Sequence, residues 1–188
     1  MGKRVLFVCV VLLTYICTSS VYAKKRSITV MTPFLAQPGT QLMVEAFEKA
    51  AHEKSWEVDV IDTSGDVAAL VSRMEDVVLQ KPDAIVINVD PKQIKTGLLA
   101  ARDAGIPVFG MDSGVDSLLQ ANVTSNGYVM AAETATFVVD QLNGQGNVVM
   151  FIFESYPPVQ MRGAIAESIF NNTPDLKILD KITPSFDK

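Results

Sequence analysis

Four apolar segments recur along the first part of the chain, and this recurrence constrains the fold more than any other feature. The segments begin near Ile28, Glu57, Ala84 and Ile106, at intervals of about 22 to 29 residues. This spacing is typical of β-α-β units, in which a helix carries the chain back so that successive strands lie parallel. We therefore predict an α/β fold, with a parallel sheet and helices on both of its faces.

The segments between these strands have apolar residues at helical spacing. Residues 39–54 and residues 66–80 each place their apolar side chains three or four positions apart, which forms one stripe for burial. Asp90 and Pro91 suit the start of a third helix. Residues 83–89 form a nearly continuous apolar run, which is typical of a parallel strand covered on both faces.

A second series of helical and strand patterns begins near Asn126. It contains two helical patterns and two strand patterns, in residues 127–142, 147–153, 158–172 and 176–182. Two strands cannot build a full sheet with both faces covered, so this unit either borrows strands or is incomplete. We predict a first α/β lobe over residues 27–125 and a partial second lobe over residues 126–188.

Residues 1–23 have the pattern of a secretory signal peptide. Lys3 and Arg4 precede a largely apolar run of 13 residues, 5–17, which is shorter than a membrane-spanning helix. Residues 21–23, "VYA", follow this run and have small residues at the spacing that signal peptidase recognises. We expect cleavage after Ala23; an uncleaved membrane anchor is the alternative.

The composition of the remaining chain excludes several partners. Both cysteines, Cys9 and Cys17, lie in the predicted signal peptide, so the secreted chain has no disulfide to form in an oxidising exterior. Without Lys3 and Arg4, 14 basic residues remain against 21 acidic ones, a formal charge of −7. Phosphate backbones require clustered lysine and arginine, so we expect no nucleic-acid partner.

The sequence lacks the motifs of the commonest enzymes. The only histidine, His52, lies on the outer flank of a predicted helix. We find no nucleophile elbow, no zinc-binding spacing and no dinucleotide glycine motif, and we expect neither a cofactor nor a metal. Carboxylates such as Asp62, Asp90 and Asp112 could do acid–base work, but no spacing pairs them. A secreted α/β enzyme therefore stays a distant alternative.

Polar residues follow the predicted strands, at the edge where parallel sheets bind ligands. Asp112 ends the fourth strand, where its carboxylate could accept hydrogen bonds from the hydroxyls of a polyol or cap a tight turn. Arg162 stands near the start of a helix and could grip a polar ligand with its planar donors, or pair with Glu167 on the surface. Asn126 could contact a ligand or form only a turn.

Five segments together resemble the periplasmic sugar-binding proteins of the ribose-binding class, which are substrate-binding proteins of ABC transporters. In order, they are "TPFLAQPGTQLMVEAFEKAA", "DVAALVSRMEDVVLQKPDAIVINVD", "GLLAARDAGIPVFGMDSGV", "VTSNGYVMAAETATFVV" and "MRGAIAESI". The resemblance covers almost everything from Ile28 onward. It implies a type I periplasmic-binding-protein fold, with two α/β lobes, a three-segment hinge and a ligand between the lobes. Members of this family have longer chains, so we expect this one to be a fragment or a truncated form.

The resemblance also implies a set of ligand-binding residues. Asp112 matches the aspartate that accepts sugar hydroxyls, and Ser113 stands where the ribose binder has an arginine. Asn126 matches the polar residue at the first crossing between the lobes. Arg162 matches the arginine that precedes a glycine in the second lobe. Gln37 falls where the first loop supplies a polar contact.

One departure from the family bears on the ligand. Gly39 and Thr40 stand where the ribose binder has aromatic residues that stack on the sugar, and Phe34 could substitute for them. The resemblance implies a secreted periplasmic receptor for a sugar, a polyol or another small polar solute. By hinge closure it would deliver this ligand to the membrane permease of an ABC importer. A receptor that feeds a membrane sensor kinase or chemoreceptor is the alternative.

Overall fold

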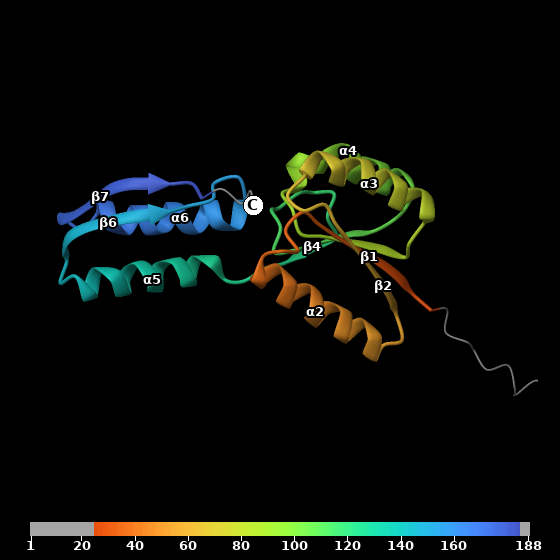
Figure 1. Ribbon diagram of the computed structural model, residues 1–188, viewed down its shortest axis with the longest axis horizontal. Coiled ribbons are helices and arrows are strands. Elements are labelled where there is room, and N and C mark those ends of the chain that lie inside the picture. The colour runs from red at the N-terminus through yellow and green to blue at the C-terminus, as the bar shows by residue number, and fades with distance from the viewer. Residues whose placement is uncertain (1–24, 185–188) are drawn as a thin grey trace, which may run out of the picture.

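The computed structural model describes residues 25–184, in which two parallel sheets lie in two lobes (Figure 1). The lobe that holds the first sheet, called the first lobe, contains β1 (Ser27–Thr32), α2 (Pro38–Glu53), β2 (Glu57–Asp62), α3 (Val67–Gln80), β3 (Ala84–Ile87), the 3-10 helix η1 (Pro91–Ile94), α4 (Lys95–Asp103), β4 (Val108–Met111) and β5 (Ala121–Val123). The lobe that holds the second sheet, called the second lobe, contains α5 (Gly127–Gln141), β6 (Gln145–Phe151), α6 (Pro157–Asn171) and β7 (Asp175–Ile182). The predicted signal peptide, residues 1–23, lies outside the described residues.

The strands of the first sheet are all parallel and follow the order β2-β1-β3-β4-β5. β1 pairs with β2 on one side and with β3 on the other, so the strand order reverses between β1 and β3. Open parallel sheets bind ligands beside the carboxyl ends of the strands at such a reversal. The predicted parallel α/β sheet is confirmed, and its topology directs attention to the residues that follow β1, β3 and β4.

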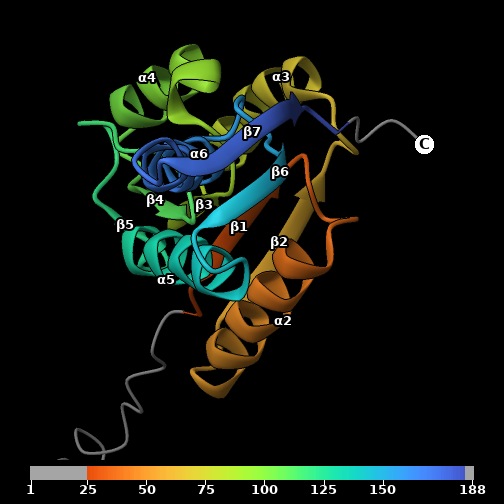
Figure 2. The same cartoon turned by 90° about the vertical axis from the view of Figure 1, so that its left-hand side faces the viewer.

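Helices cover both faces of this sheet, with α3 and α4 on one face and α2 on the other (Figures 1 and 2). Residues of β1 serve both faces, because successive side chains of a strand point to opposite sides. Met31 packs in the core that contains Leu70 and Leu98 of α3 and α4, whereas Val30 packs with Val44 of α2. Full burial of such a side chain contributes roughly 1.5–3 kcal/mol to folding.

The helix predicted after β3 is divided in the structure. Asp90 caps the short helix η1 by accepting a hydrogen bond from the backbone N–H of Lys92 at 3.1 Å. The α-helix α4 begins only at Lys95. Gly105 follows α4 with a φ of 72°, in the left-handed region that glycine enters without steric cost. The predicted cap at Asp90 is confirmed, although the helix that it caps is shorter than expected.

The strand β5 was not predicted from the sequence. It has three residues with only its middle one partly buried, so it lacks the apolar run that marks the other strands. Its pairing with β4 holds it in place, with Phe109 opposite Ala121 and Met111 opposite Val123. The strand leads into residues 124–126, which join the two lobes (Figure 1).

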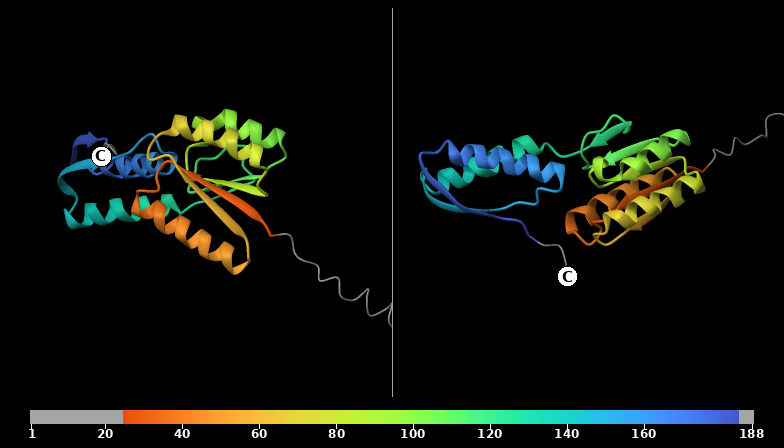
Figure 3. Two further views of the ribbon diagram at one scale, coloured as in Figure 1. Left: turned by 45° about the vertical axis from the view of Figure 1, so that its right-hand side comes forward. Right: turned by 90° about the horizontal axis from the view of Figure 1, so that it is seen from above.

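In the second lobe, β6 pairs in parallel with β7. The helices α5 and α6 pack side by side (Figure 3) and share a core with both strands, which includes Ala135, Met150, Phe170 and Leu176. Within residues 25–184 the chain passes between the lobes once, so the three-segment hinge stays a prediction. None of the helices in this described part has both the length and the apolar character needed to cross a membrane.

Candidate functional site

Asp112 directly follows β4, at the junction between the lobes. Its backbone has a φ of 49°, a left-handed conformation that few residues other than glycine, asparagine and aspartate adopt. Its N–H donates to the carbonyl of Val123 at 2.7 Å, and its carboxylate Oδ1 accepts from Thr124 Oγ1 at 2.5 Å. The other carboxylate oxygen, Oδ2, has no hydrogen-bond partner among residues 25–184. The carboxylate therefore keeps acceptor positions for a ligand hydroxyl.

Arg162 reaches the same junction from α6 in the second lobe. Its Nη2 donates to Ser125 Oγ at 2.7 Å and stands 3.8 Å from Asp112 Oδ1. The alternative pair between Arg162 and Glu167 is not formed, because Glu167 is paired with Lys181 at 3.1 Å. The side chains of Asp112 and Arg162 are 15% and 28% exposed, so solvent reaches both without surrounding them. The structure thus brings these two predicted site residues together.

A close approach of α5 and α6 positions the Arg162 side chain. Gly127 begins α5, and a Cβ atom there would lie 2.6 Å from Met161 Cε and 3.2 Å from Arg162 Nε. Arg162 Nε is buried and is without a hydrogen-bond partner in the described part of the chain. A buried donor that lacks a partner is costly, so this nitrogen would gain from an acceptor supplied by a ligand.

Asn88 ties the ends of the central strands together. The residue is 1% exposed, and its Oδ1 accepts from Thr32 Oγ1 at 3.1 Å and from Thr40 Oγ1 at 3.3 Å. Its Nδ2 donates to the Met111 carbonyl at 2.7 Å and to the Tyr156 hydroxyl at 2.9 Å. An amide side chain offers two donor hydrogens and two acceptor positions, so all of them are used here.

Tyr156 crosses from the second lobe into the first. It is the N-cap residue of α6, yet its hydroxyl accepts from Asn88 and donates to the backbone carbonyl of Asp112. Its ring centroid lies 5.7 Å from that of Phe34, which in turn lies 6.5 Å from Phe153. Burial raises the pKa of the Tyr156 phenol, and the negative charge of Asp112 acts in the same direction. The phenol is therefore a neutral hydrogen-bond donor at neutral pH.

The other predicted site residues are Ser113, Asn126 and Gln37. Ser113 is 3% exposed, and its hydroxyl donates to the carbonyl of Val89 at 2.6 Å. Asn126 is exposed and caps α5, because its Oδ1 accepts from the backbone N–H of Val129 at 3.2 Å. Gln37 precedes α2 at the end that faces the junction between the lobes (Figure 1). Their contacts with a ligand stay predictions.

Sequence reasoning did not select Asn88, Ser125 or Tyr156 as site residues. Asn88 directly follows β3, and the rule that ligands bind beyond the carboxyl ends of strands places it among the candidate positions, but it was not chosen as a site residue. Tyr156 lies in the loop after β6, directly before Pro157 at the start of α6, so the same rule applies to it. Ser125 carries no such signal, because it matters only through its contact with Arg162.

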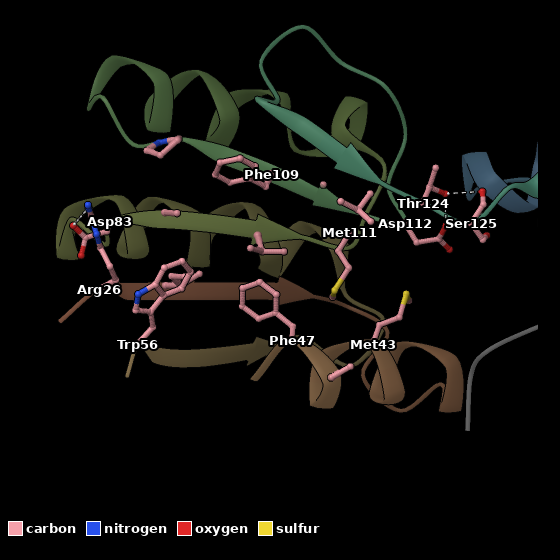
Figure 4. A pocket seen from close by; sticks show the side chains of 17 residues that line it. Arg26, Met43, Phe47, Trp56, Asp83, Phe109, Met111, Asp112, Thr124 and Ser125 are labelled. Atoms are coloured by element: carbon pink, nitrogen blue, oxygen red, sulfur yellow. Dashed lines mark hydrogen bonds and ion pairs between the residues drawn. The ribbon is translucent and has the colours of Figure 1, made fainter. Parts of the chain in front are cut away.

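An apolar groove lies on the sheet face beside α2, and it extends away from this site (Figure 4). Its volume is about 980 Å³, and its lining includes Phe47, Trp56 and Phe109. Sugar hydroxyls buried against such a surface would lose their hydrogen bonds to water without replacement. The groove meets the candidate site at one end, where Asp112, Thr124 and Ser125 line both. We therefore place the candidate ligand site at the junction of the lobes.

Comparison with known proteins agrees with this geometry. The sequence profile of a family described as "Periplasmic binding protein domain" matches residues 28–188. The ribose import binding protein of Bacillus subtilis is 27% identical over 172 residues, 88% of this chain and 54% of that protein. The xylitol-binding protein of Mycolicibacterium smegmatis is 25% identical over 126 residues, 65% of this chain and 36% of that protein.

A solved structure shows the same fold. An ABC transporter solute binding protein from Agrobacterium vitis with bound allitol has a TM-score of 0.75 and 26% sequence identity. The comparison covers 86% of this chain and 55% of that one. The chain thus spans about half the length of the Bacillus subtilis and Agrobacterium vitis proteins. All three relatives are described as solute-binding proteins and none as an enzyme.

Proposed function

The chain belongs to the periplasmic binding protein family, and on this premise we propose that it is a secreted receptor for a sugar or polyol. It binds the ligand between its two lobes and delivers it to the membrane permease of an ABC importer. Residues 1–23 direct its export to the periplasm and are then removed. The binding step is closure of the lobes around the ligand, as in other two-lobed receptors.

One observation carries this proposal: Oδ1 of Asp112 in the first lobe stands 3.8 Å from Nη2 of Arg162 in the second. A carboxylate accepts hydrogen bonds from hydroxyls, and a guanidinium donates to oxygen atoms, so a polyhydroxylated ligand satisfies both. A ligand that contacts both lobes stabilises the closed form by its differential affinity for that form. Either lobe alone offers only part of these contacts.

The ligand class follows from the polar chemistry of the site. Thr40 donates its hydroxyl hydrogen to Asn88, and Gly39 has no side chain, so neither residue stacks on a sugar ring. Phe34 packs against two aromatic residues of the second lobe instead. The names of the relatives include ribose, xylitol and allitol, which share a chain of hydroxyl groups. We propose a ligand of this kind for the present chain.

The proposed membrane partner is a permease. The name of the Bacillus subtilis relative specifies import, and that of the Agrobacterium vitis protein specifies an ABC transporter. These names favour an importer over the alternative, a sensor kinase or chemoreceptor that would be contacted by the same closed form. Uptake of the bound solute by cells that express this chain with its permease distinguishes the two partners.

Isothermal titration calorimetry with D-ribose, xylitol and allitol tests the binding proposal. We expect at least one of them to bind in the micromolar range, which corresponds to about −8.2 kcal/mol. Asp112→Asn should weaken this binding by at least about tenfold, because a carboxylate forms stronger, charge-assisted hydrogen bonds than an amide. Asparagine also tolerates the left-handed backbone of this position, so the substitution leaves the turn intact.

A matched control is Asp103→Asn, which changes an aspartate on α4 that is 67% exposed and pairs with its neighbour Arg102. The Asp103→Asn protein should bind the ligand with the same affinity as the unaltered protein. Failure of all three compounds to bind would contradict the proposed ligand class. Equal affinity of the Asp112→Asn protein would contradict the proposed site.

A further inference from the structure

We infer that Tyr156 is a positioning residue that couples closure of the two lobes to the orientation of the Asp112 carboxylate. This inference rests on the proposed function, because it concerns the residue that would accept the hydroxyls of the ligand. Tyr156 would act through the main chain of Asp112 rather than by touching the ligand.

The tyrosine hydroxyl makes both of its contacts in the other lobe. It donates to the backbone carbonyl of Asp112, 44 residues earlier in the chain, and it accepts from Asn88 Nδ2 at 2.9 Å. It does not bond to the Asp112 carboxylate, whose Oδ1 is bonded to Thr124. The tyrosine thus holds the residue by its backbone and leaves the carboxylate to the ligand.

The backbone of Asp112 needs such support. Its φ of 49° lies in a region that side-chain-bearing residues rarely occupy. The N–H of Asp112 is held by the carbonyl of Val123 at 2.7 Å, within the first lobe. Its carbonyl is held by Tyr156, from the second lobe. Only the closed arrangement therefore restrains the residue on both sides.

The contact that guides the tyrosine is rigid. Asn88 is buried, and its other three hydrogen bonds go to Thr32, Thr40 and Met111. The tyrosine ring also packs edge-to-face against Phe34 of the first lobe. The phenol therefore docks in one place each time the lobes close.

The residues beside Tyr156 and Asp112 also approach closely. Pro157 follows the tyrosine, and Gly114 lies two positions beyond Asp112. A Cβ atom at Gly114 would lie 3.2 Å from Pro157 Cγ, so there is no room for a larger residue without a shift. The loop after β6 and the loop after β4 are therefore packed together, and movement of the second lobe alters the surroundings of Asp112 directly.

The energetic consequence is a mutual dependence between closure and binding. When the lobes separate, the Asp112 carbonyl loses its partner, and the remaining hydrogen bonds of Asp112 are those to Val123 and Thr124 of the first lobe. When the lobes close, the turn is restrained and the carboxylate keeps one orientation. Ligand binding at Asp112 and docking of Tyr156 should then favour each other to the same degree, as linkage requires.

Amide hydrogen exchange in the free protein tests the inference without a ligand. Tyr156→Phe keeps the ring and removes only the hydroxyl. We expect the Asp112 amide to exchange on the order of tenfold faster in this variant, because its turn opens more often. The amide of Val86 in the sheet should be unchanged. The control is Tyr128→Phe, a tyrosine of α5 that is 66% exposed. An unchanged exchange rate at Asp112 would overturn the inference.

A double-mutant cycle on ligand binding separates positioning from a general structural role. The titrations use D-ribose, xylitol and allitol with the unaltered protein, Tyr156→Phe, Asp112→Asn and the double variant. Tyr156→Phe alone should weaken binding by about tenfold and should have no further effect in the Asp112→Asn protein. Independent losses that multiply in the double variant would overturn the inference. If the unaltered protein binds none of the three compounds, the proposed function fails, and the exchange measurement still decides the inference.

Discussion

The guanidinium of Arg162 donates a hydrogen bond to Ser125 at 2.7 Å but stands 3.8 Å from the carboxylate of Asp112. The first distance is that of a hydrogen bond, and the second is too long for one. The two opposite charges therefore face each other across the junction without satisfying each other fully. A ligand hydroxyl between them can accept from the arginine and donate to the aspartate, so the loose pair is suited to being bridged.

Arg162→Lys tests the role of the planar guanidinium. Lysine keeps the positive charge but loses the fork of fixed donors, so binding of the ligand found by calorimetry should weaken by about tenfold. Thermal stability should be unchanged, because the arginine forms one partly exposed hydrogen bond, to Ser125. The matched control is Arg73→Lys, on α3, where the side chain is 64% exposed. Equal binding by both variants would show that only the charge at position 162 matters.

Asn88→Ala tests the hydrogen-bond network at the strand ends. The change leaves the Met111 carbonyl and the hydroxyls of Thr32 and Thr40 without their buried partner, at a cost of about 3 kcal/mol in unfolding free energy. Urea denaturation followed by circular dichroism measures this loss. Asn171→Ala, at an exposed position on α6, should change the unfolding free energy by less than about 0.5 kcal/mol. A loss equal to that of the control would contradict the role given to Asn88.

The stability of the protein at high pH should depend on Tyr156. Burial raises the pKa of its phenol, so in the unfolded chain the proton leaves at about pH 10 while the folded protein retains it. The protonated phenol therefore stabilises the folded protein fully below about pH 10, and this contribution is lost as the pH rises further. Above this pH, the melting temperature of Tyr156→Phe should fall less steeply than that of the unaltered protein.

Absorbance at 295 nm checks the same titration directly. Between about pH 9 and 11 the folded protein and Tyr156→Phe should gain the same tyrosinate signal, because Tyr156 does not ionise there. A smaller gain in Tyr156→Phe than in the unaltered protein would contradict the raised pKa.

At low pH, stability should depend on Asp116 in the loop between β4 and β5. Its carboxylate accepts from the backbone N–H of Leu118 at 2.9 Å and pairs with Lys95 at 3.0 Å, and these contacts lower its pKa. The stabilisation is therefore present above the unfolded pKa of about 3.9 and is lost as the pH falls below it.

Asp116→Asn should accordingly lower the melting temperature at pH 7, and the difference from the unaltered protein should vanish as the pH falls to about 2. Differential scanning calorimetry across this range measures both. Asp76→Asn is the control, because Asp76 is 61% exposed and stands 3.9 Å from Arg73. A difference that persists at the lowest pH would show that the carboxylate charge is not the cause.

Much of the fold could be predicted because its signals are local. The apolar runs and helical stripes of residues 27–111 correspond to β1 to β4 and to α2, α3 and α4. The strand β5 escaped prediction, since two of its three residues are exposed and its conformation depends on pairing with β4. The division of the third helix also escaped, because Ile94 interrupts it with a φ of −118° that no residue pattern marks.

The candidate site could be predicted only in part, for a related reason. Asp112 follows a strand, and Arg162 lies near the start of a helix, so both carry a local signal as well as a resemblance to the family. The roles of Asn88 and Tyr156 depend on a contact between residues that are 68 positions apart. No periodicity or motif indicates such a contact before the two lobes are placed against each other.

The main-chain conformation at Asp112 restricts how the recognition of solutes could be altered. A φ of 49° favours aspartate, asparagine or glycine, and it strains branched side chains. Glycine would remove the side-chain acceptor entirely, so aspartate and asparagine are the acceptors that this conformation favours. New selectivity would have to be introduced at the neighbours Thr124, Ser125 and Arg162, none of which has a positive φ. The residue that is fixed by its backbone and the residues that could be varied are thus different members of one small site.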